Sequence, residues 1–114
     1  MPAYQAAKMM RLHFSEHDRY NGRPLYEAVV EKCRELKIAG ITVFRGFEGY
    51  GGTAEIHRPH LFIHDLPIVI NIVDSAESIE LLAPVVEEMM DTGLIAVSDV
   101  QIQRIQKQRV AAHV

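Results

Sequence analysis

Residues 40–52 read G-I-T-V-F-R-G-F-E-G-Y-G-G, an apolar segment that runs directly into a glycine-rich one. Glycine enters positive φ without steric cost, so a glycine-rich backbone turns tightly and exposes its N–H groups. The stretch therefore predicts a strand over residues 41–44, followed by a loop that is able to cradle an anion. Four glycines fall within the seven residues that open this loop: Gly46, Gly49, Gly51 and Gly52.

The residues that follow are polar until a second strong strand pattern begins. Residues 66–73 read L-P-I-V-I-N-I-V and are apolar on both faces apart from Asn71. A strand of an antiparallel sheet with helices on one side only would normally alternate between apolar and polar residues. We therefore expect a long functional loop over residues 46–64, and a cover of some kind on the second face of the strand at 66–73.

Upstream of this pair of strands, the pattern predicts one strand and one helix. Met10, Leu12 and Phe14 alternate with polar residues, which is typical of a strand with one buried face. Residues 15–22 form a polar connection. Pro24 is suited to the first turn of a helix, where its missing N–H costs nothing. The apolar face of that helix is predicted to comprise Leu25, Val29, Cys33 and Leu36.

Downstream, the pattern predicts a second helix and a last strand. Asp74 followed by Glu77 resembles a capping box, and Pro84 inside the helix predicts a kink or a late start. Thr92 and Gly93 end the helix, and the last strand lies within residues 94–105. The apolar stripe of this helix comprises Ile79, Leu82, Val86 and Met89.

The predicted order, strand-helix-strand-strand-helix-strand, is the α+β ferredoxin-like βαββαβ sandwich, an antiparallel sheet with both helices on one face. We expect a single domain over residues 1–114, with a loose leader at 1–7 and a polar tail at 106–114. The doubly apolar strand at 66–73 indicates that the open sheet face is buried against other subunits. Closed symmetry dominates soluble oligomers, which favours a ring.

Composition excludes several classes of protein. The net charge of −3 over 114 residues argues against binding to nucleic acid, which calls for a basic surface. No apolar run approaches the ~20 residues that cross a bilayer, and the N-terminus lacks a signal-peptide pattern. The single cysteine, Cys33, forms no internal disulfide and fits a reducing compartment. These features predict a cytoplasmic protein.

Several stretches resemble, in order and spacing, the PII signalling proteins and more closely a small bacterial PII-like family of unknown function. They are I-A-G-I-T-V-F-R-G-F-E-G-Y-G, A-E-I-H-R, D-L-P-I-V-I-N-I-V and D-T-G-L-I-A-V-S-D-V, within residues 9–105, and the early H-D-R-Y-N-G-R-P-L-Y-E is similar to the PII-like family alone. The resemblance implies a homotrimer in which ATP, ADP or AMP binds between neighbouring subunits. It also implies that a mobile T-loop over residues 46–64 reports the bound state to a membrane transporter or a cytoplasmic enzyme.

The resemblance also implies a set of ligand-binding residues. Gly49 and Gly51, with Tyr50 between them, match the G-F-G at the base of the PII T-loop, whose backbone meets the nucleotide phosphates. Thr42 matches a strand threonine near the adenine. Gly52 stands where PII proteins have a basic residue, and the phosphate-binding T-G-x-x-G-D-G-K is reduced to residues 92–93. The candidate phosphate-binding cations are Arg45, Arg58 and Arg104, because Arg suits bidentate oxyanion contacts.

Two other classes of function stay open. Imidazole is the commonest metal ligand, so His57, His60 and His64 could hold a divalent ion in a metal-binding or metal-homeostasis protein of the trimeric ferredoxin-like type. Alternatively, the chain is an assembly module whose loop contacts a protein without any small ligand. An enzyme is the least favoured class. Cys33 lies on an apolar helix face, and the adjacent Glu87 and Glu88 point in different directions.

Overall fold

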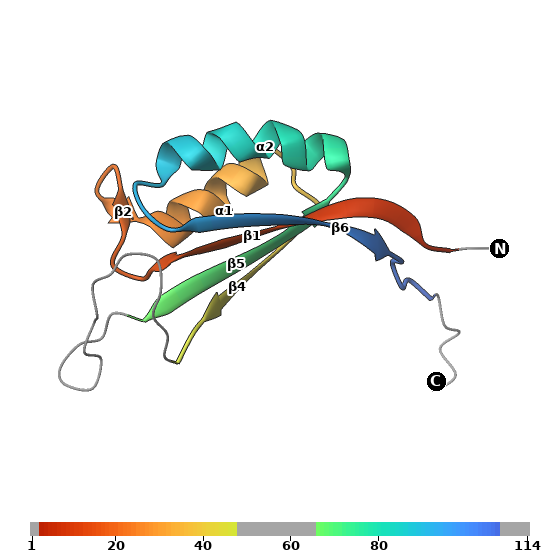
Figure 1. Cartoon of the computed structure of the whole chain (residues 1–114), viewed down its shortest axis with the longest axis horizontal. Helices are drawn as coiled ribbons and strands as arrows, with labels where there is room; N and C mark the ends of the chain where they lie inside the picture. The colour runs from red at the N-terminus through yellow and green to blue at the C-terminus, as the bar shows by residue number, and fades with distance from the viewer. Residues whose placement is uncertain (1–2, 48–65, 108–114) are drawn as a thin grey trace, which may run out of the picture.

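The computed structural model describes residues 3–47 and 66–107. The strands outside a small hairpin form one antiparallel sheet in the order β4-β5-β1-β6, and both helices cover one face of it (Figure 1), as predicted. The described part of the chain therefore has the ferredoxin-like α+β plan. Its elements are β1 (Gln5–Ser15), β2 (Arg19–Tyr20), β3 (Arg23–Pro24), α1 (Leu25–Glu35), β4 (Gly40–Arg45), β5 (Pro67–Asp74), α2 (Ala76–Met89) and β6 (Leu94–Ile102).

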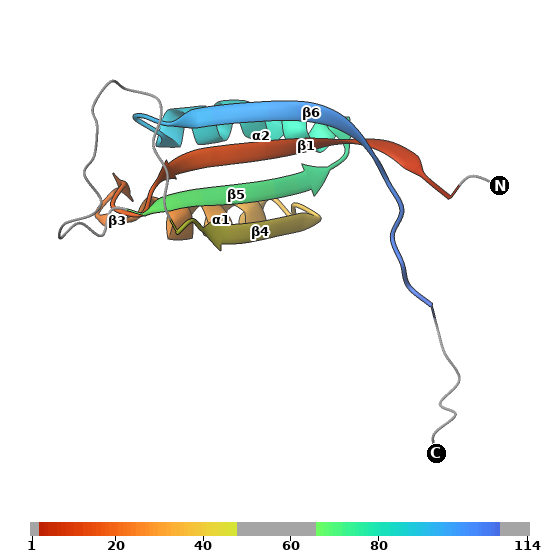
Figure 2. The same ribbon diagram turned by 60° about the horizontal axis from the view of Figure 1, so that its bottom comes forward.

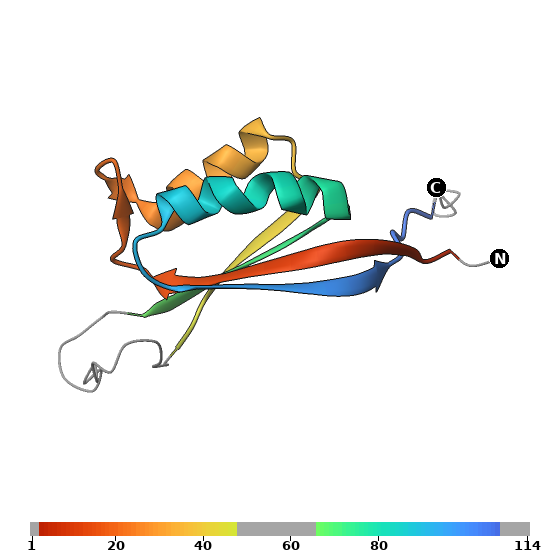
Figure 3. The same ribbon diagram turned by 45° about the horizontal axis from the view of Figure 1, so that its top comes forward.

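The core lies between the sheet and the two helices, which lie next to each other on that face (Figure 3). The alternation predicted for β1 is confirmed, because Met10 and Leu12 are fully buried. On β5, every second residue is buried in the same way. The predicted stripe of α2 is also confirmed. The buried side chains from these two elements are Ile68, Ile70, Ile72, Ile79, Leu82, Val86 and Met89.

The opposite face of the sheet has no covering layer in the described part of the chain, and Figure 2 turns this face toward the reader. Because successive strand residues point to opposite faces, the residues between the buried ones lie on this side. Apolar side chains are exposed here: Phe44 of β4 is 49% exposed and Leu94 of β6 is 57% exposed. We refer to this side as the open face.

Two expectations for the first quarter of the chain are wrong. The leader predicted over residues 1–7 is shorter, because β1 begins at Gln5, which pairs with Ile102 of β6. The polar connection predicted over residues 15–22 includes β2 and the turn of a hairpin, which continues into β3 just beyond it. Asn21 and Gly22 form its turn with φ of 51° and 81°, and Asn-Gly with positive φ at both residues is typical of a two-residue hairpin.

The helix ends also differ in detail from the sequence prediction. Leu36 is not on the buried face of α1; it is the C-cap and 46% exposed. Ser75, rather than Asp74, caps α2, because its Oγ accepts a hydrogen bond of 3.1 Å from the Ser78 N–H. Asp74 instead accepts from the Ala39 N–H at 2.9 Å.

α2 begins well before Pro84 and continues through it, so the predicted late start is wrong. No helix of the described residues is long and apolar enough to cross a membrane.

Gly93 joins α2 to β6 in a conformation that only glycine adopts without strain. Its φ is 125°, and a Cβ atom there would lie 2.4 Å from the backbone oxygen of His13. The close approach of this turn to the end of β1 therefore depends on the missing side chain. Gly40 is different, since a Cβ atom at that position would meet nothing nearer than the Val73 oxygen at 3.7 Å.

We therefore expect Gly93→Ala to lower the free energy of unfolding by more than about 2 kcal/mol, through strained φ and a backbone clash. The control Gly40→Ala should stay within about 0.5 kcal/mol of wild type. Urea unfolding followed by circular dichroism measures both. Equal midpoints for the two variants would contradict this account of the turn.

Candidate functional site

The end of β4 and the start of β5 are held together at the base of the predicted loop. The Gly46 N–H donates to the Pro67 carbonyl at 2.7 Å. A Cβ atom at Gly46 would lie 2.6 Å from Cγ of Pro67, so this approach requires glycine. The Glu16 N–H donates to the Leu66 carbonyl at 2.9 Å, which ties the end of β1 to the same place.

The Glu16 carboxylate links both strand ends through its side chain, which is only 9% exposed. Its Oε1 accepts from Nε of Arg45 at 2.9 Å and also from Nη2. Its Oε2 accepts from the Leu66 N–H at 3.2 Å. The Arg45 guanidinium and the Leu66 N–H hold the pKa of Glu16 below its usual range. We call Glu16, Arg45 and Leu66 the Glu16 clasp.

The clasp changes the role that Arg45 can take in ligand binding. The sequence predicts Arg45 as a candidate cation for phosphate, and in the structure this residue has a carboxylate partner. Charge-assisted hydrogen bonds to a carboxylate are among the strong ones. An anionic ligand at Arg45 must therefore compete with Glu16.

Thr42 lies on the open face of β4. It is opposite Asn71 of β5 in the register of the sheet, and its side chain is exposed. Asn71 is the polar residue that interrupts the apolar pattern of β5. The structure therefore places Thr42 beside Asn71, the polar residue within the apolar pattern at 66–73.

Arg104 lies at the other end of the sheet from Arg45. Arg45 aligns with Ile68 and through it with Phe14 of β1, whereas β6 ends beside Gln5, just before Arg104. From Gln5 to Phe14, β1 is roughly 30 Å long at about 3.3 Å per residue. One chain therefore cannot bring Arg45 and Arg104 to the same small ligand.

The other predicted site residues lie outside the described ranges. Within residues 3–47 and 66–107, no group of three or more His, Cys, Asp or Glu side chains is placed to hold a metal ion. The residues outside these ranges are Gly49, Tyr50, Gly51, Gly52 and Arg58 of the predicted nucleotide site and His57, His60 and His64 of the predicted metal site.

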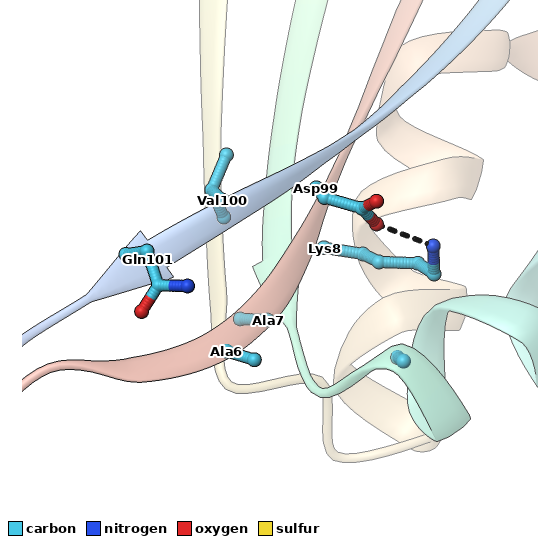
Figure 4. Close-up of a pocket in the computed structure, with 7 residues that line it drawn as sticks. Ala6, Ala7, Lys8, Asp99, Val100 and Gln101 are labelled. Atoms are coloured by element: carbon cyan, nitrogen blue, oxygen red, sulfur yellow. Dashed lines mark hydrogen bonds and ion pairs between the residues drawn. The ribbon is translucent and has the colours of Figure 1, made fainter.

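Grooves open on the described surface, and two of them differ in the residues that line them. The larger, about 460 Å³, lies where β1 and β6 pass the start of α2 (Figure 4). There Nζ of Lys8 donates to Oδ1 of Asp99 at 2.6 Å, which raises the pKa of Lys8. The residues that line this larger groove are Ala6, Ala7, Lys8, Ala76, Asp99, Val100 and Gln101.

The smaller groove, about 180 Å³, includes Thr92 and Gly93, which the sequence resemblance aligns with part of the PII phosphate-binding loop. Glu87 and Asp91 also line it. Two carboxylates make this groove unfavourable for a phosphate within one chain. A phosphate would therefore need cations from elsewhere.

The single thiol is buried, as predicted. Cys33 is 1% exposed, and burial raises its pKa to about 11. The thiolate is the nucleophilic form, and it is disfavoured here. Cys33 therefore acts as a small apolar core residue.

Solved structures of similar fold include PII-like proteins. CPII of Thiomonas intermedia K12, a nitrogen regulatory PII-like protein bound to ADP, AMP and bicarbonate, aligns with a TM-score of 0.63 and 20% identity over 89% of this chain and 92% of its own. GlnK of B. subtilis aligns with a TM-score of 0.54 and 11% identity over 84% and 86%. These likenesses show that the chain has the PII-like fold.

The chain belongs to the DUF190 family, described as an uncharacterised family, which it matches over residues 7–102. It is 35% identical to a UPF0166 protein of Aquifex aeolicus over 97 residues, which are 83% of this chain and 91% of that protein. It is 31% identical to a UPF0166 protein of Methanocaldococcus jannaschii over 101 residues, covering 86% and 93%. The PII-like family inferred from the sequence is confirmed.

The Glu16 clasp predicts a specific loss of stability in acid. The folded-state pKa of Glu16 is lowered, so its contribution is complete above the unfolded value of about 4.5 and is lost as the pH falls through the folded value. Glu16→Gln should therefore lower the urea midpoint near neutral pH and lose less stability than wild type on acidification.

The exposed Glu35→Gln is the matched control, because Glu35 lies at the end of α1 away from the clasp. It should keep the wild-type dependence on pH. If wild type, Glu16→Gln and Glu35→Gln all lose the same amount of stability as the pH falls, the clasp does not contribute to folding.

Proposed function

We propose that this protein is a PII-like regulatory protein that binds an adenine nucleotide between the subunits of a homotrimer. Two observations support the proposal. CPII, which shares the fold, binds ADP and AMP. In addition, the cations predicted to contact phosphate lie at opposite ends of the sheet in one chain.

The separation of Arg45 from Arg104 is the observation that carries the proposal. A ligand a nucleotide in size reaches both residues only if one comes from a neighbouring copy of the chain. The open face, with exposed Phe44 and Leu94, supplies an apolar surface for such an assembly. In a closed ring, the open face of every copy is covered by neighbouring copies in the same way.

The phosphates are proposed to meet the backbone at Gly49 and Gly51, with Arg58 of the same segment and Arg104 of a neighbour as cations. Phosphate would then compete with Glu16 for Arg45 at the base of the loop. When phosphate replaces the Glu16 carboxylate on Arg45, the Glu16 clasp that holds the ends of β4 and β5 together is loosened. A ligand shifts a conformational equilibrium only by binding its two states differently, and this exchange supplies such a difference.

The loop over residues 46–64 is proposed to report the exchange to a target in the cytoplasm. The proposed target is a membrane transporter or a cytoplasmic enzyme. Order–disorder changes of a segment are a common form of switch.

Isothermal titration calorimetry of the purified oligomer with ATP, ADP and AMP, each with and without Mg²⁺, tests the proposal. We expect saturable binding of at least one nucleotide at one site per chain. Absence of heat with every nucleotide would overturn it. Metal that co-purifies with the protein and is lost in a variant with His57, His60 and His64 replaced by Ala would then favour the metal-binding alternative.

A mixing experiment tests whether the site is shared between copies. Gly51→Val and Arg104→Ala should each abolish or strongly weaken nucleotide binding in homogeneous oligomers. If the two residues come from different chains, random co-assembly of the two variants restores about a quarter of the sites in a ring with one interface per chain. Mixtures as inactive as their parents would place both residues in one chain.

A further inference from the structure

One row of side chains crosses the middle of the open face. The register pairs Thr42 of β4 with Asn71 of β5, Asn71 with Arg11 of β1, and Arg11 with Ala96 of β6. Met10 and Leu12 are fully buried against the helices, so Arg11 between them points to the open side. Arg11 therefore places a fixed positive charge on one of the two inner strands of the sheet.

Asn71 holds the Arg11 guanidinium in place. Nε of Arg11 donates to Oδ1 of Asn71 at 3.1 Å, and Nη2 donates to Sδ of Met9 at 3.4 Å. Neither acceptor carries a charge, and thioether sulfur is a weak acceptor. The guanidinium is therefore oriented without being neutralised.

The other cations on the strands of this sheet have carboxylate partners. Lys8 pairs with Asp99 and Arg45 pairs with Glu16. Arg11 has no ion-pair partner among the described residues. The carboxylates that these strands carry, Asp74 and Asp99, align with Lys8 and so fall on the side of the sheet opposite to Arg11.

The rows on either side of Arg11 contain no Asp, Glu, Lys or Arg. They offer mainly apolar surface, broken by one imidazole and one hydroxyl. One row contains Phe44, Val69, His13 and Leu94, and the other contains Gly40, Val73, Met9 and Ser98.

An assembly through the open face would remove Arg11 from water. An isolated charge moved into a protein interior costs several kcal/mol unless it is paired. Symmetry-related copies of this face add further arginines and no carboxylate of their own. Burying this face in a homo-oligomer therefore costs less when an anion from outside the face neutralises Arg11.

We propose that Arg11, held by Asn71, is a binding site for a small oxyanion between the open faces of assembled copies, separate from the nucleotide site. The inference rests on the homo-oligomer proposed above. The guanidinium fork matches the geometry of an oxyanion, and Nη1 has no partner among the described residues. Inorganic phosphate, with several oxygens to share between arginines, is the probe of choice.

The test is a dilution series of the oligomer by sedimentation velocity, in sodium phosphate and in sodium chloride of equal ionic strength. Phosphate at ten times its own dissociation constant should lower the apparent dissociation constant of the wild-type assembly by about tenfold for each anion bound. Arg11→Met should show the same constant in both salts, at least as tight as wild type in chloride, because no charge is then buried. Arg11→Lys should respond less than wild type.

The control Arg104→Ala removes a cation of the nucleotide site and should keep the full phosphate response. A loss of the response in this variant would mean that phosphate acts at the nucleotide site, which overturns the inference. An Arg11→Met assembly weaker than wild type in both salts would also overturn it, since Arg11 would then pair with a protein carboxylate. An oligomer that binds nucleotide but ignores phosphate contradicts this inference alone, whereas a wild-type chain that never associates contradicts the proposed function as well.

Discussion

The structure depends on one constraint, which is that both helical crossovers pack on the same face of the sheet. β1 and β4 are parallel to each other across β5, and β5 and β6 are parallel across β1. The two crossovers run in opposite directions along the sheet and join strands of opposite direction. Crossovers of the usual right hand therefore place both helices on one side. That side holds the core, and the other side, with Phe44 and Leu94, is left open.

The open face and the loop base show how the chain distributes its positive charge. Arg45 sits at a strand end and is paired with Glu16, which also binds the Leu66 N–H. Arg11 sits in the middle of the open face and is only oriented, by the neutral Asn71. A paired cation can exchange one anion for another, and an oriented but unpaired one can accept an anion. An anionic ligand would therefore have to displace Glu16 from Arg45, whereas Arg11 offers its charge without such competition from the described residues.

The sequence predicted the parts of the fold that hydrophobic periodicity controls. Met10 and Leu12 alternate with polar residues, and Leu82 and Val86 are one helical turn apart. Each pattern predicts which face of its element is buried, and the structure confirms both predictions. The strands of the β2–β3 hairpin are too short to show a period, so the sequence predicts only a polar connection around its Asn-Gly turn.

The charged contacts were harder to predict. Glu16 and Arg45 are far apart in sequence, and no local pattern marks a carboxylate that closes a loop base. The sequence predicts Asp74 as the cap of α2 although Ser75 caps it, because Asp and Ser cap helices equally well. Asn71 is visible in the sequence as the polar break in β5, but its hydrogen-bond partner Arg11 follows only from the register of the strands. Pairing between distant strands is a tertiary property, so these residues emerged only from the structure.

The central claim is that two copies of this chain complete each ligand site. Native mass spectrometry of the protein titrated with ADP tests it most directly, because one spectrum reports both the number of chains and the number of nucleotides bound. The account predicts a closed assembly of three chains that takes up as many as three ADP molecules. Single chains that each bind one ADP would contradict it.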